Sequence, residues 1–308
     1  MRRKHLLIIL VAIGIFLGYV AFSGTLRSRP DSSGAKIKVT ASFYPMAEFA
    51  RQVGGDRVEV TTLIAPGVEP HDYDPSPQDL ATLQTSSLFV YNGAGLETWA
   101  ARVVGDMRAR GGVAVEASSG LPLKAAASGS ENAGHDPHVW LDPVLASREV
   151  DQIATGLVRA DPAGRTIYQA NAAAFKSQLA DLDAAYRAGL QTCARRDIVT
   201  SHQAFAYLGA RYGLNVMPIA GLAPDEEPSP QKLAQITQFV RQNDVRYIFF
   251  ESLASPKLSD TIARETGAKT LVFNPLEGLT DAERAQGQNY LTVQRQNLAN
   301  LRIALDCK

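Results

Sequence analysis

The chain has 308 residues, 45% of them hydrophobic, and its 31 basic and 31 acidic side chains give a formal net charge of zero. This is ordinary globular composition, and at about 150 residues per domain the length predicts roughly two domains behind an N-terminal segment. The composition argues against nucleic-acid binding, because phosphate recognition needs clustered Lys and Arg and the sequence has no basic stripe.

The N-terminus is predicted to be a targeting segment. Arg2, Arg3 and Lys4 precede an uncharged, mainly apolar stretch over residues 6–22, as in the n-region and h-region of an export signal. The stretch is intermediate in length between a signal peptide and a membrane span, so residues 1–24 are either a signal peptide or an uncleaved signal anchor. Both alternatives place the rest of the chain outside the cytoplasm, in the periplasm or on the outer face of the membrane, behind a polar linker at 25–35.

Strand-like and helix-like segments alternate through residues 36–160, which we predict to be an N-terminal α/β lobe. Apolar β-type runs predict strands at 36–42, 58–64, 88–91 and 113–115. Helices are predicted at 46–53, at 76–85 and from Pro143 onward; Ser76 and Pro77 are a favourable N-cap and first helical residue. Residues 121–134, rich in Ala, Ser and Gly, are predicted to form a loop.

A long helix is predicted over residues 161–190. Asp161 and Pro162 form an N-cap and first-residue pair, and apolar residues then recur at steps of three and four from Tyr168 to Leu190. About 30 residues at 1.5 Å each would make a rod of ~45 Å. We therefore interpret residues 161–191 as a rigid connector between two lobes.

Residues 192–308 repeat the alternation and are predicted to be a C-terminal α/β lobe. Strands are predicted at 197–200, 215–218, 246–250 and 270–273, and helices at 203–212, 229–243, 257–267 and 289–305. Gly213 and Gly267 are typical helix C-terminal residues. The predicted fold class is therefore α/β, with two parallel-sheet α/β lobes joined by a long connecting α-helix.

Three of the five histidines, His71, His138 and His202, each lie just past an apolar β-type run. Neutral imidazole is the commonest nitrogen ligand for zinc, copper, nickel and iron, and in open α/β folds ligands gather at the carboxyl ends of the strands. One such histidine is more often structural, but three at matching positions predict a metal site in a cleft between the lobes. His135, at the end of the loop, is either a solvated residue or a further participant.

A fourth ligand should be anionic, because three neutral imidazoles leave the full double charge on a divalent ion. Glu277, in the loop after the last predicted strand, is the best candidate, and Asn274 in the same loop is a weaker donor. Three imidazoles and one carboxylate suit tetrahedral zinc, whereas manganese prefers more oxygen ligands. We therefore predict Zn²⁺ as the bound ion, with Mn²⁺ as the alternative.

The two cysteines, Cys193 and Cys307, are predicted to form a disulfide, because an exported protein meets an oxidising compartment. Two unrelated buried thiols are the alternative, since spacing alone does not establish contact. Closing a loop of ~100 residues would stabilise the fold by about 4.7 kcal/mol in the chain-entropy model, less any strain.

These motifs together resemble the solute-binding components of zinc and manganese ABC importers, the cluster-A metal-binding lipoproteins and their periplasmic relatives. The resemblance extends from about Lys36 to Lys308 and rests on four segments: GVEPHDY at 67–73, DPHVWLDP at 136–143, TSHQAFAYL at 200–208 and NPLEGLT at 274–280. It implies two lobes joined by a long helix, with the metal held between them and delivered to a membrane permease driven by a cytoplasmic ATPase.

The resemblance also implies the ligands. His71, His138 and His202 match the family's three histidine ligands, and Glu277 resembles the glutamate of zinc-type members. Manganese-type members usually have Asp near position 274, where this chain has Asn. The cysteine pair resembles one seen in some relatives, which supports the disulfide.

Two departures from the family pattern remain: residues 121–134 contain no histidine, and no cysteine follows the N-terminal apolar stretch.

We expect a monomeric, non-catalytic zinc receptor. A manganese receptor is the alternative within the class, and a zinc hydrolase with Glu277 as general base, or a surface adhesin, are the alternatives from other classes.

Overall fold

The computed structural model of the protein describes residues 36–126 and 134–308. The predicted signal segment at 1–24, the linker at 25–35 and residues 127–133 of the predicted loop at 121–134 lie outside these residues. Among the helices of the described ranges, none has the length and apolarity needed to cross a membrane.

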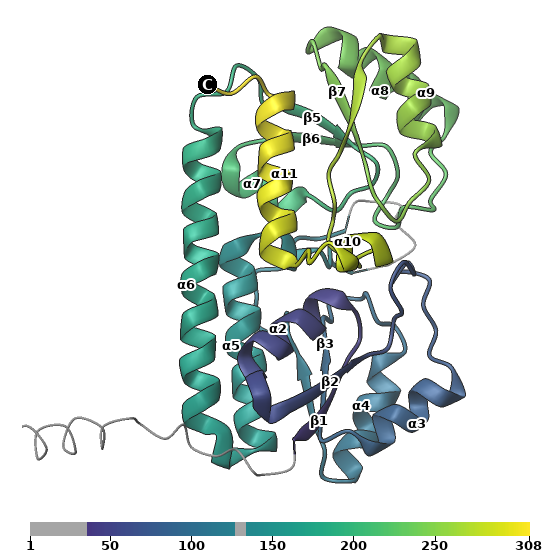
Figure 1. The fold of residues 1–308 in the computed structure, drawn as a ribbon. Coiled ribbons are helices and arrows are strands. Elements are labelled where there is room, and N and C mark those ends of the chain that lie inside the picture. Colours follow the sequence, from purple (N-terminus) through teal and green to yellow (C-terminus); the bar gives the residue numbers. More distant parts are fainter. Residues whose placement is uncertain (1–35, 127–133) are drawn as a thin grey trace, which may run out of the picture. The chain divides into compact units, whose positions relative to one another are not determined.

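The first lobe is built on a four-stranded parallel sheet with the strand order β2-β1-β3-β4 (Figure 1). Its strands are β1 (Ile37–Ala41), β2 (Val58–Thr62), β3 (Leu88–Tyr91) and β4 (Val113–Glu116), and its helices are α2 (Tyr44–Gly54), α3 (Pro77–Thr85), α4 (Ala100–Ala109) and α5 (Pro143–Ala160). The prediction missed α4. Its N-cap Trp99 makes no side-chain cap bond and Gly105 interrupts its interior, so the usual start signal is missing and the propensity is low.

The second lobe repeats this arrangement with the strand order β6-β5-β7-β8, again all parallel. Its strands are β5 (Asp197–Thr200), β6 (Asn215–Pro218), β7 (Tyr247–Phe250) and β8 (Lys269–Val272). Its helices are α7 (Ala206–Tyr212), α8 (Pro230–Gln242), α9 (Lys257–Thr266), α10 (Asp281–Ala285) and α11 (Tyr290–Ala304). The predicted fold class is confirmed, although α10 was missed and α7 begins three residues later than predicted.

Helix α6 (Arg165–Leu190) is the long helix of the sequence analysis and packs against α2 and α5 of the first lobe and α7 and α11 of the second (Figure 1). Every apolar residue of its predicted stripe is buried. The predicted start at Asp161 was wrong, because residues Pro162–Gly164 form a 3-10 turn and the Asp161 carboxylate does not cap the helix. It accepts hydrogen bonds from Arg57 Nη2 at 2.7 Å and Tyr168 Oη at 2.6 Å instead.

Cys193 and Cys307 form a disulfide across a sequence separation of 114 residues. The bond joins the segment after α6 to the segment after α11, so it fixes the C-terminal end of the chain to the start of the second lobe. The predicted pairing is therefore confirmed.

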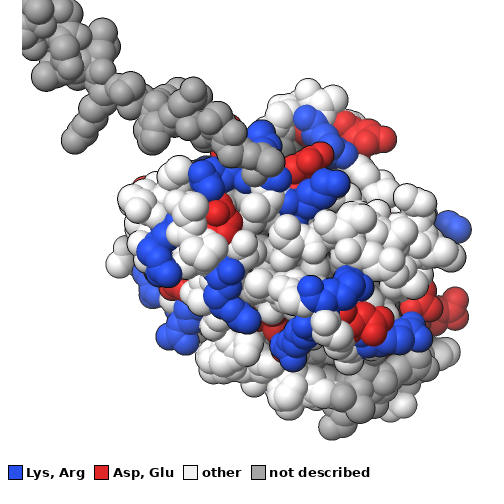
Figure 2. All heavy atoms as spheres, turned by 90° about the horizontal axis from the view of Figure 1, so that it is seen from below, with Lys and Arg blue, Asp and Glu red and all other residues white. Residues whose placement is uncertain are grey.

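Basic and acidic side chains are interspersed on the face shown in Figure 2, which is the underside of the view in Figure 1. Among the described residues on this face, the charged side chains form no continuous patch of one sign. The four candidate metal ligands do not belong to this charged surface but lie in segments that follow the carboxyl ends of β2, β4, β5 and β8.

Candidate metal centre

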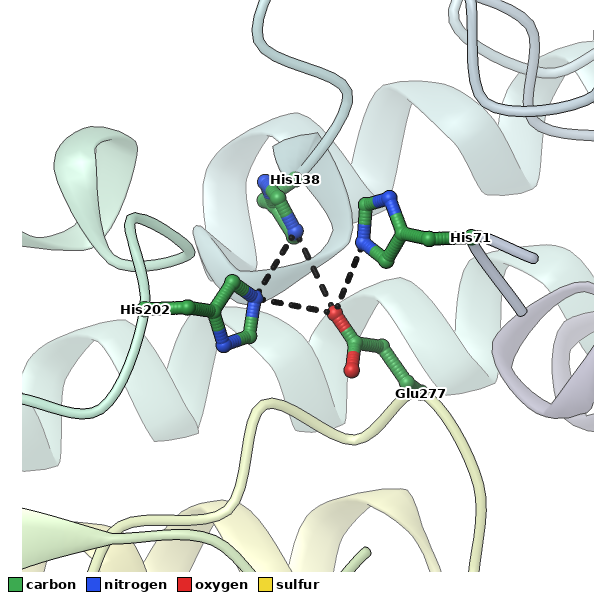
Figure 3. A group of neighbouring side chains, drawn as sticks. All are labelled: His71, His138, His202 and Glu277. Carbon is green, nitrogen blue, oxygen red and sulfur yellow. Dashed lines mark hydrogen bonds and ion pairs between the residues drawn. The ribbon is translucent and has the colours of Figure 1, made fainter. Parts of the chain in front are cut away.

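The four residues singled out in the sequence lie together, with their side chains directed toward one another (Figure 3). His71 follows β2, His138 follows β4, His202 follows β5 and Glu277 follows β8. One ligand atom from each of the four lies within 4.8 Å of the others. The two lobes thus each contribute two donors to one cluster, as the positions at strand carboxyl ends predicted.

A single carboxylate oxygen lies at the centre of the cluster. Glu277 Oε1 is 3.3 Å from His71 Nε2, 3.2 Å from His138 Nε2 and 3.2 Å from His202 Nε2. The side chains of all four residues are at most 2% exposed. Three imidazole nitrogens and one carboxylate are therefore directed at one small volume that solvent does not reach.

His138 is oriented by a carboxylate two residues before it. Asp136 Oδ1 accepts hydrogen bonds from His138 Nδ1 at 2.8 Å and from the His138 backbone N–H at 3.0 Å. This leaves His138 Nε2 to point into the cluster. The segment itself is anchored from the first lobe by Asn92 Nδ2, which donates to Pro137 O at 3.0 Å.

His202 is oriented in the same way by a carboxylate from a neighbouring strand. His202 Nδ1 lies 2.6 Å from Oε1 of Glu251, the residue directly after β7, and Ser201 Oγ donates to the same oxygen. Metal-bound histidines usually donate their second ring N–H to such an acceptor, which fixes the tautomer and raises the basicity of the ligating nitrogen. The sequence analysis missed both Asp136 and Glu251. The available signal in the sequence was position: Asp136 stands two residues before a candidate ligand, and Glu251 stands directly after a strand.

His71 is held differently, in the loop between β2 and α3. Its backbone N–H donates to Glu69 Oε1 at 3.3 Å, but its buried Nδ1 has no partner within the described residues. Within the described residues, Glu277 is therefore the one hydrogen-bond partner of the ring, which also packs near the rings of His138 and His202.

The Glu277 loop is shaped by Asn274, which the sequence analysis considered as a weaker donor. Asn274 Oδ1 accepts the Leu276 N–H at 2.7 Å, and its Nδ2 donates to Ser252 Oγ at 2.8 Å. Leu276 adopts a left-handed conformation with φ of 59°, which turns the next side chain inward. Asn274 therefore supports the loop with its amide, and Glu277 provides the carboxylate.

His135 is exposed and does not belong to the cluster. It forms an isolated antiparallel bridge with Ala125 at the base of the predicted loop.

The cluster is strongly coupled electrostatically. Burial alone would lower the pKa of His202, but the carboxylates of Glu251 and Glu277 outweigh it and hold this pKa well above its usual value. Burial would raise the pKa of Glu277, but the three histidines hold it well below the usual range. The pKa of His71 is lowered by burial, against the opposing effect of Glu277. Burial would also lower the pKa of His138, but Asp136 and Glu277 outweigh it, so the carboxylates stabilise the protonated rings of both His138 and His202.

The donor set is chemically suited to one divalent ion. Three neutral imidazoles and one carboxylate make a four-coordinate nitrogen-rich site, and Glu277 Oε2 is buried with no hydrogen-bond partner within the described residues. Proteins rarely leave a buried carboxylate oxygen without a partner, so this atom is available as a further donor.

Comparison with known proteins identifies the family. Residues 39–304 match the family described as ZnuA, zinc-uptake complex component A, periplasmic. The chain belongs to this family. The match covers both lobes and all four residues of the cluster, and it confirms the resemblance drawn from the sequence motifs.

Relatives match over nearly the whole chain. The high-affinity zinc uptake system protein ZnuA of Bacillus subtilis is 38% identical over 99% of both chains. The zinc-binding lipoprotein AdcA of Streptococcus pneumoniae is 37% identical over 91% of this chain, which spans 58% of the length of AdcA.

Solved structures share the fold. Zn(II)-bound AdcA from Streptococcus pneumoniae gives a TM-score of 0.79 at 38% identity, covering 89% of this chain and 59% of AdcA. The laminin-binding protein Lmb of Streptococcus agalactiae, described as bifunctional with adhesin and metal transporting activity, gives a TM-score of 0.79 at 35% identity. That match covers 87% of this chain and 99% of Lmb.

Proposed function

We propose that this chain is the extracytoplasmic receptor of an ABC importer, which binds Zn²⁺ between its lobes and delivers it to a membrane permease driven by a cytoplasmic ATPase. The proposed ligands are His71, His138, His202 and Glu277. The observation that supports them most strongly is the convergence of three buried Nε2 atoms on Glu277 Oε1, at 3.2 to 3.3 Å.

The choice of zinc over manganese rests on the donor set. Tetrahedral zinc is satisfied by three nitrogens and a carboxylate, whereas manganese favours oxygen ligands and higher coordination numbers. Asn274, at the position where an additional carboxylate would favour manganese, has its amide engaged with Leu276 and Ser252. The zinc-related names of the relatives point in the same direction.

The burial of the ligands supports a capture and release cycle. Each lobe contributes two ligands, so separating the lobes, or withdrawing one ligand loop, would reduce the coordination number and weaken binding. A receptor needs this property, because the ion must leave again at the permease.

We include in the proposal the division into lobes at 36–160 and 192–308 with a connector at 161–191, and the monomeric state.

We further propose that the chain is not an enzyme. A catalytic zinc site keeps an open position for water, whereas here a fourth protein ligand, Glu277, occupies that position and cannot also serve as a free general base. Turnover of ester or peptide substrates by the zinc-loaded protein would contradict this part of the proposal.

The extracytoplasmic location rests on the N-terminal segment and the names of the relatives, some of which are called periplasmic and some lipoproteins. We propose residues 1–24 as the export signal or anchor and residues 25–35 as the linker. Mass spectrometry of the protein from the native host would distinguish cleavage from retention of this segment.

Titration calorimetry with Zn²⁺ and Mn²⁺, using chelator competition where binding is tight, tests the assignment. We expect zinc to bind with 1:1 stoichiometry and far more tightly than manganese. His135→Ala is the matched control, because His135 is an exposed histidine outside the cluster. Tighter manganese binding, or zinc binding that depends on His135, would contradict the proposal.

Adhesion is a second candidate function, favoured by the similarity to the bifunctional Lmb of Streptococcus agalactiae. Binding of the purified protein to immobilised laminin tests it directly. A deletion strain distinguishes the two functions, because a growth defect in metal-depleted medium that zinc rescues is expected only for import.

A further inference from the structure

The first lobe has a further carboxylate beside the metal centre, which does not belong to the proposed ligand set. Glu69 lies two residues before His71, in the loop between β2 and α3. Its Oε1 accepts the His71 backbone N–H at 3.3 Å, which is long for a hydrogen bond. Its Oε2 is buried and has no hydrogen-bond partner within the described residues. Because buried polar atoms in proteins are seldom left without a partner, this oxygen is a candidate donor to a further group.

The loop of Glu69 lies against the loop of Glu277. Val68, the residue before Glu69, has its carbonyl oxygen 4.0 Å from the position that a Cβ atom on Gly278 would take. Gly278 in turn directly follows Glu277. His71 links the two carboxylates from a second direction, because its backbone N–H contacts Glu69 and its Nε2 lies 3.3 Å from Glu277 Oε1. One carboxylate thus comes from each lobe, and both lie next to the same histidine.

The two carboxylates act on each other electrostatically. Burial and, after it, the charge of Glu277 raise the pKa of Glu69 to about 9. The charge of His202 acts in the opposite direction on the same pKa, so Glu69 interacts with ligands from the second lobe. Two carboxylates in one buried region disfavour each other's charge, and a divalent cation between them removes that repulsion. Glu69 is therefore suited to a position beside a bound ion.

In the present arrangement Glu69 is a neighbour of the ligand set and not a member of it. The ligand atoms that lie within 4.8 Å of one another come from His71, His138, His202 and Glu277. Separation of the lobes would remove the two ligands of the second lobe together and leave two neutral imidazoles on the first. Glu69 would stay with them, because it shares its loop with His71. Two imidazoles and one carboxylate are an established zinc donor set, with water in the fourth position.

We propose that Glu69 is an exchange ligand for the ion, which takes the place of Glu277 when the Glu277 loop withdraws and gives it back when the loop returns. One zinc–oxygen bond breaks and another forms in each exchange, so the charge of the site does not change. The ion then keeps a carboxylate ligand throughout capture and release, and it stays on the first lobe while the second lobe moves. This inference rests on the proposed function, because it assumes that zinc binds at the four-residue cluster.

Two simpler roles of Glu69 make different predictions. As a purely structural residue, Glu69 would order the loop through its bond to the His71 N–H, and Glu69→Gln would preserve that acceptor. As a purely electrostatic residue, Glu69 would attract the ion by its charge, whichever ligand occupied the site. Neither role depends on whether the Glu277 carboxylate is present. An exchange ligand does depend on it, because it binds the ion directly only where Glu277 is absent.

A double-mutant cycle separates these roles, with the zinc dissociation constant measured by chelator competition. Glu69→Gln alone should weaken zinc binding by about threefold or less, because Glu277 already provides the carboxylate. In a Glu277→Ala background the same substitution should weaken binding by about tenfold or more, since it removes the replacing carboxylate. Asp72→Asn is the matched control, because Asp72 is an exposed carboxylate on the same loop, and its effect should be small and equal in both backgrounds.

Stopped-flow kinetics give a second readout that a structural role would not reproduce. An exchange ligand stabilises the intermediate between free and bound zinc, so its removal should slow zinc uptake and zinc release together. For Glu69→Gln we expect both rate constants to fall by about threefold or more, with a smaller change in their ratio. Loosening of the loop would instead speed release and leave uptake nearly unchanged.

An equal effect of Glu69→Gln in both backgrounds would overturn the proposal, and so would faster zinc release by this variant. Thermal melting of the metal-free variants checks that each one folds, and Glu277→Gln replaces Glu277→Ala as the background if the alanine variant does not. Failure of the wild-type protein to bind zinc would contradict the proposed function instead. Normal zinc binding by the wild type together with an additive cycle would contradict the exchange alone.

Discussion

The two sides of the metal centre are held in place by different means. His138 and His202 each have a carboxylate on Nδ1, from Asp136 at 2.8 Å and Glu251 at 2.6 Å. His71 has no such partner within the described residues, and it lies on a loop between Pro66 and Pro75 that contains no helix or strand. One side of the site is therefore fixed in advance, and the other depends on its loop.

Hydrogen bonds across the lobe junction reinforce this difference. Trp140 Nε1 donates to Pro275 O at 2.8 Å, Tyr290 Oη donates to Trp140 O at 2.5 Å, and Gln294 Nε2 donates to Leu141 O at 3.2 Å. These bonds tie the segment after His138 to the Glu277 loop and α11. His138, His202 and Glu277 thus form a preorganised group, and His71 completes it from the side. Preorganisation lowers the ordering cost of binding.

Removal of a preorganised ligand should have the largest effect. His202→Ala leaves three of the four proposed ligands, and we expect zinc affinity to fall by about a hundredfold or more, a quarter of a typical four-ligand zinc binding energy. Chelator competition measures the loss, with His135→Ala as the control. An unchanged affinity would exclude His202 as a ligand.

Removal of an orienting carboxylate should have the next largest effect. Glu251→Gln keeps the shape of the side chain but removes the negative charge that His202 Nδ1 faces. We expect zinc affinity to fall by about 10- to 100-fold, the usual cost of losing such a partner. Asp136→Asn should act in the same way on His138. Glu265→Gln, on the second lobe in α9, is a control that should change nothing.

Removal of His71 should cost less. His71→Ala leaves the preorganised group intact. In this variant the loop no longer has to be ordered when zinc binds, and this saving offsets part of the free energy lost with the ligand. We expect a loss of about tenfold in zinc affinity, mostly as faster dissociation. Stopped-flow measurement of zinc release into a chelator checks this. A loss as large as that of His202→Ala would show that the two sides contribute equally.

The smallest expected effect is that of pH. The carboxylates of Glu251 and Glu277 raise the pKa of His202, so protons compete with zinc for this ring. Lower pH favours the protonated ring and weakens zinc binding, by about threefold for each half unit of pH if one proton is released. Calorimetry in two buffers of different ionisation enthalpy counts the protons. Glu251→Gln should release fewer protons when zinc binds, because the protonated His202 ring would lose the carboxylate that stabilises it.

The four candidate residues chosen from the sequence converge in the structure, whereas the groups that surround them were not predicted. Histidines at the carboxyl ends of parallel strands are informative because strand direction alone brings those ends together. The carboxylates of Asp136 and Glu251 were not predicted, because acidic residues near strand ends are common and only the ring orientations show which of them accept a hydrogen bond. The start of α6 was misplaced for a similar reason, since a distant partner, Arg57, takes the Asp161 carboxylate away from the helix end.

The two sheets have equivalent strand orders, but residues at equivalent positions have different roles, which the sequence pattern alone does not distinguish. Ser42 Oγ donates to Glu97 Oε1 at 2.6 Å after the strands β1 and β3, and Ser201 Oγ donates to Glu251 after the equivalent strands β5 and β7. The residue after each serine is Phe43 in the first lobe and His202 in the second. The same scaffold therefore supports an aromatic core residue in one lobe and a candidate ligand in the other.

The sequence by itself determined the α/β class and the long helix and indicated the four residues of the cluster, because periodicity, strand ends and residue chemistry are local properties. The pairing of Cys193 with Cys307 stayed one of two alternatives until the structure brought the two residues together. Only the tertiary structure decided which carboxylates orient the histidines, and that the ring of His71 has no such partner within residues 36–126 and 134–308. Those features depend on distances between residues far apart in the chain, which packing of the two lobes sets and no local pattern encodes.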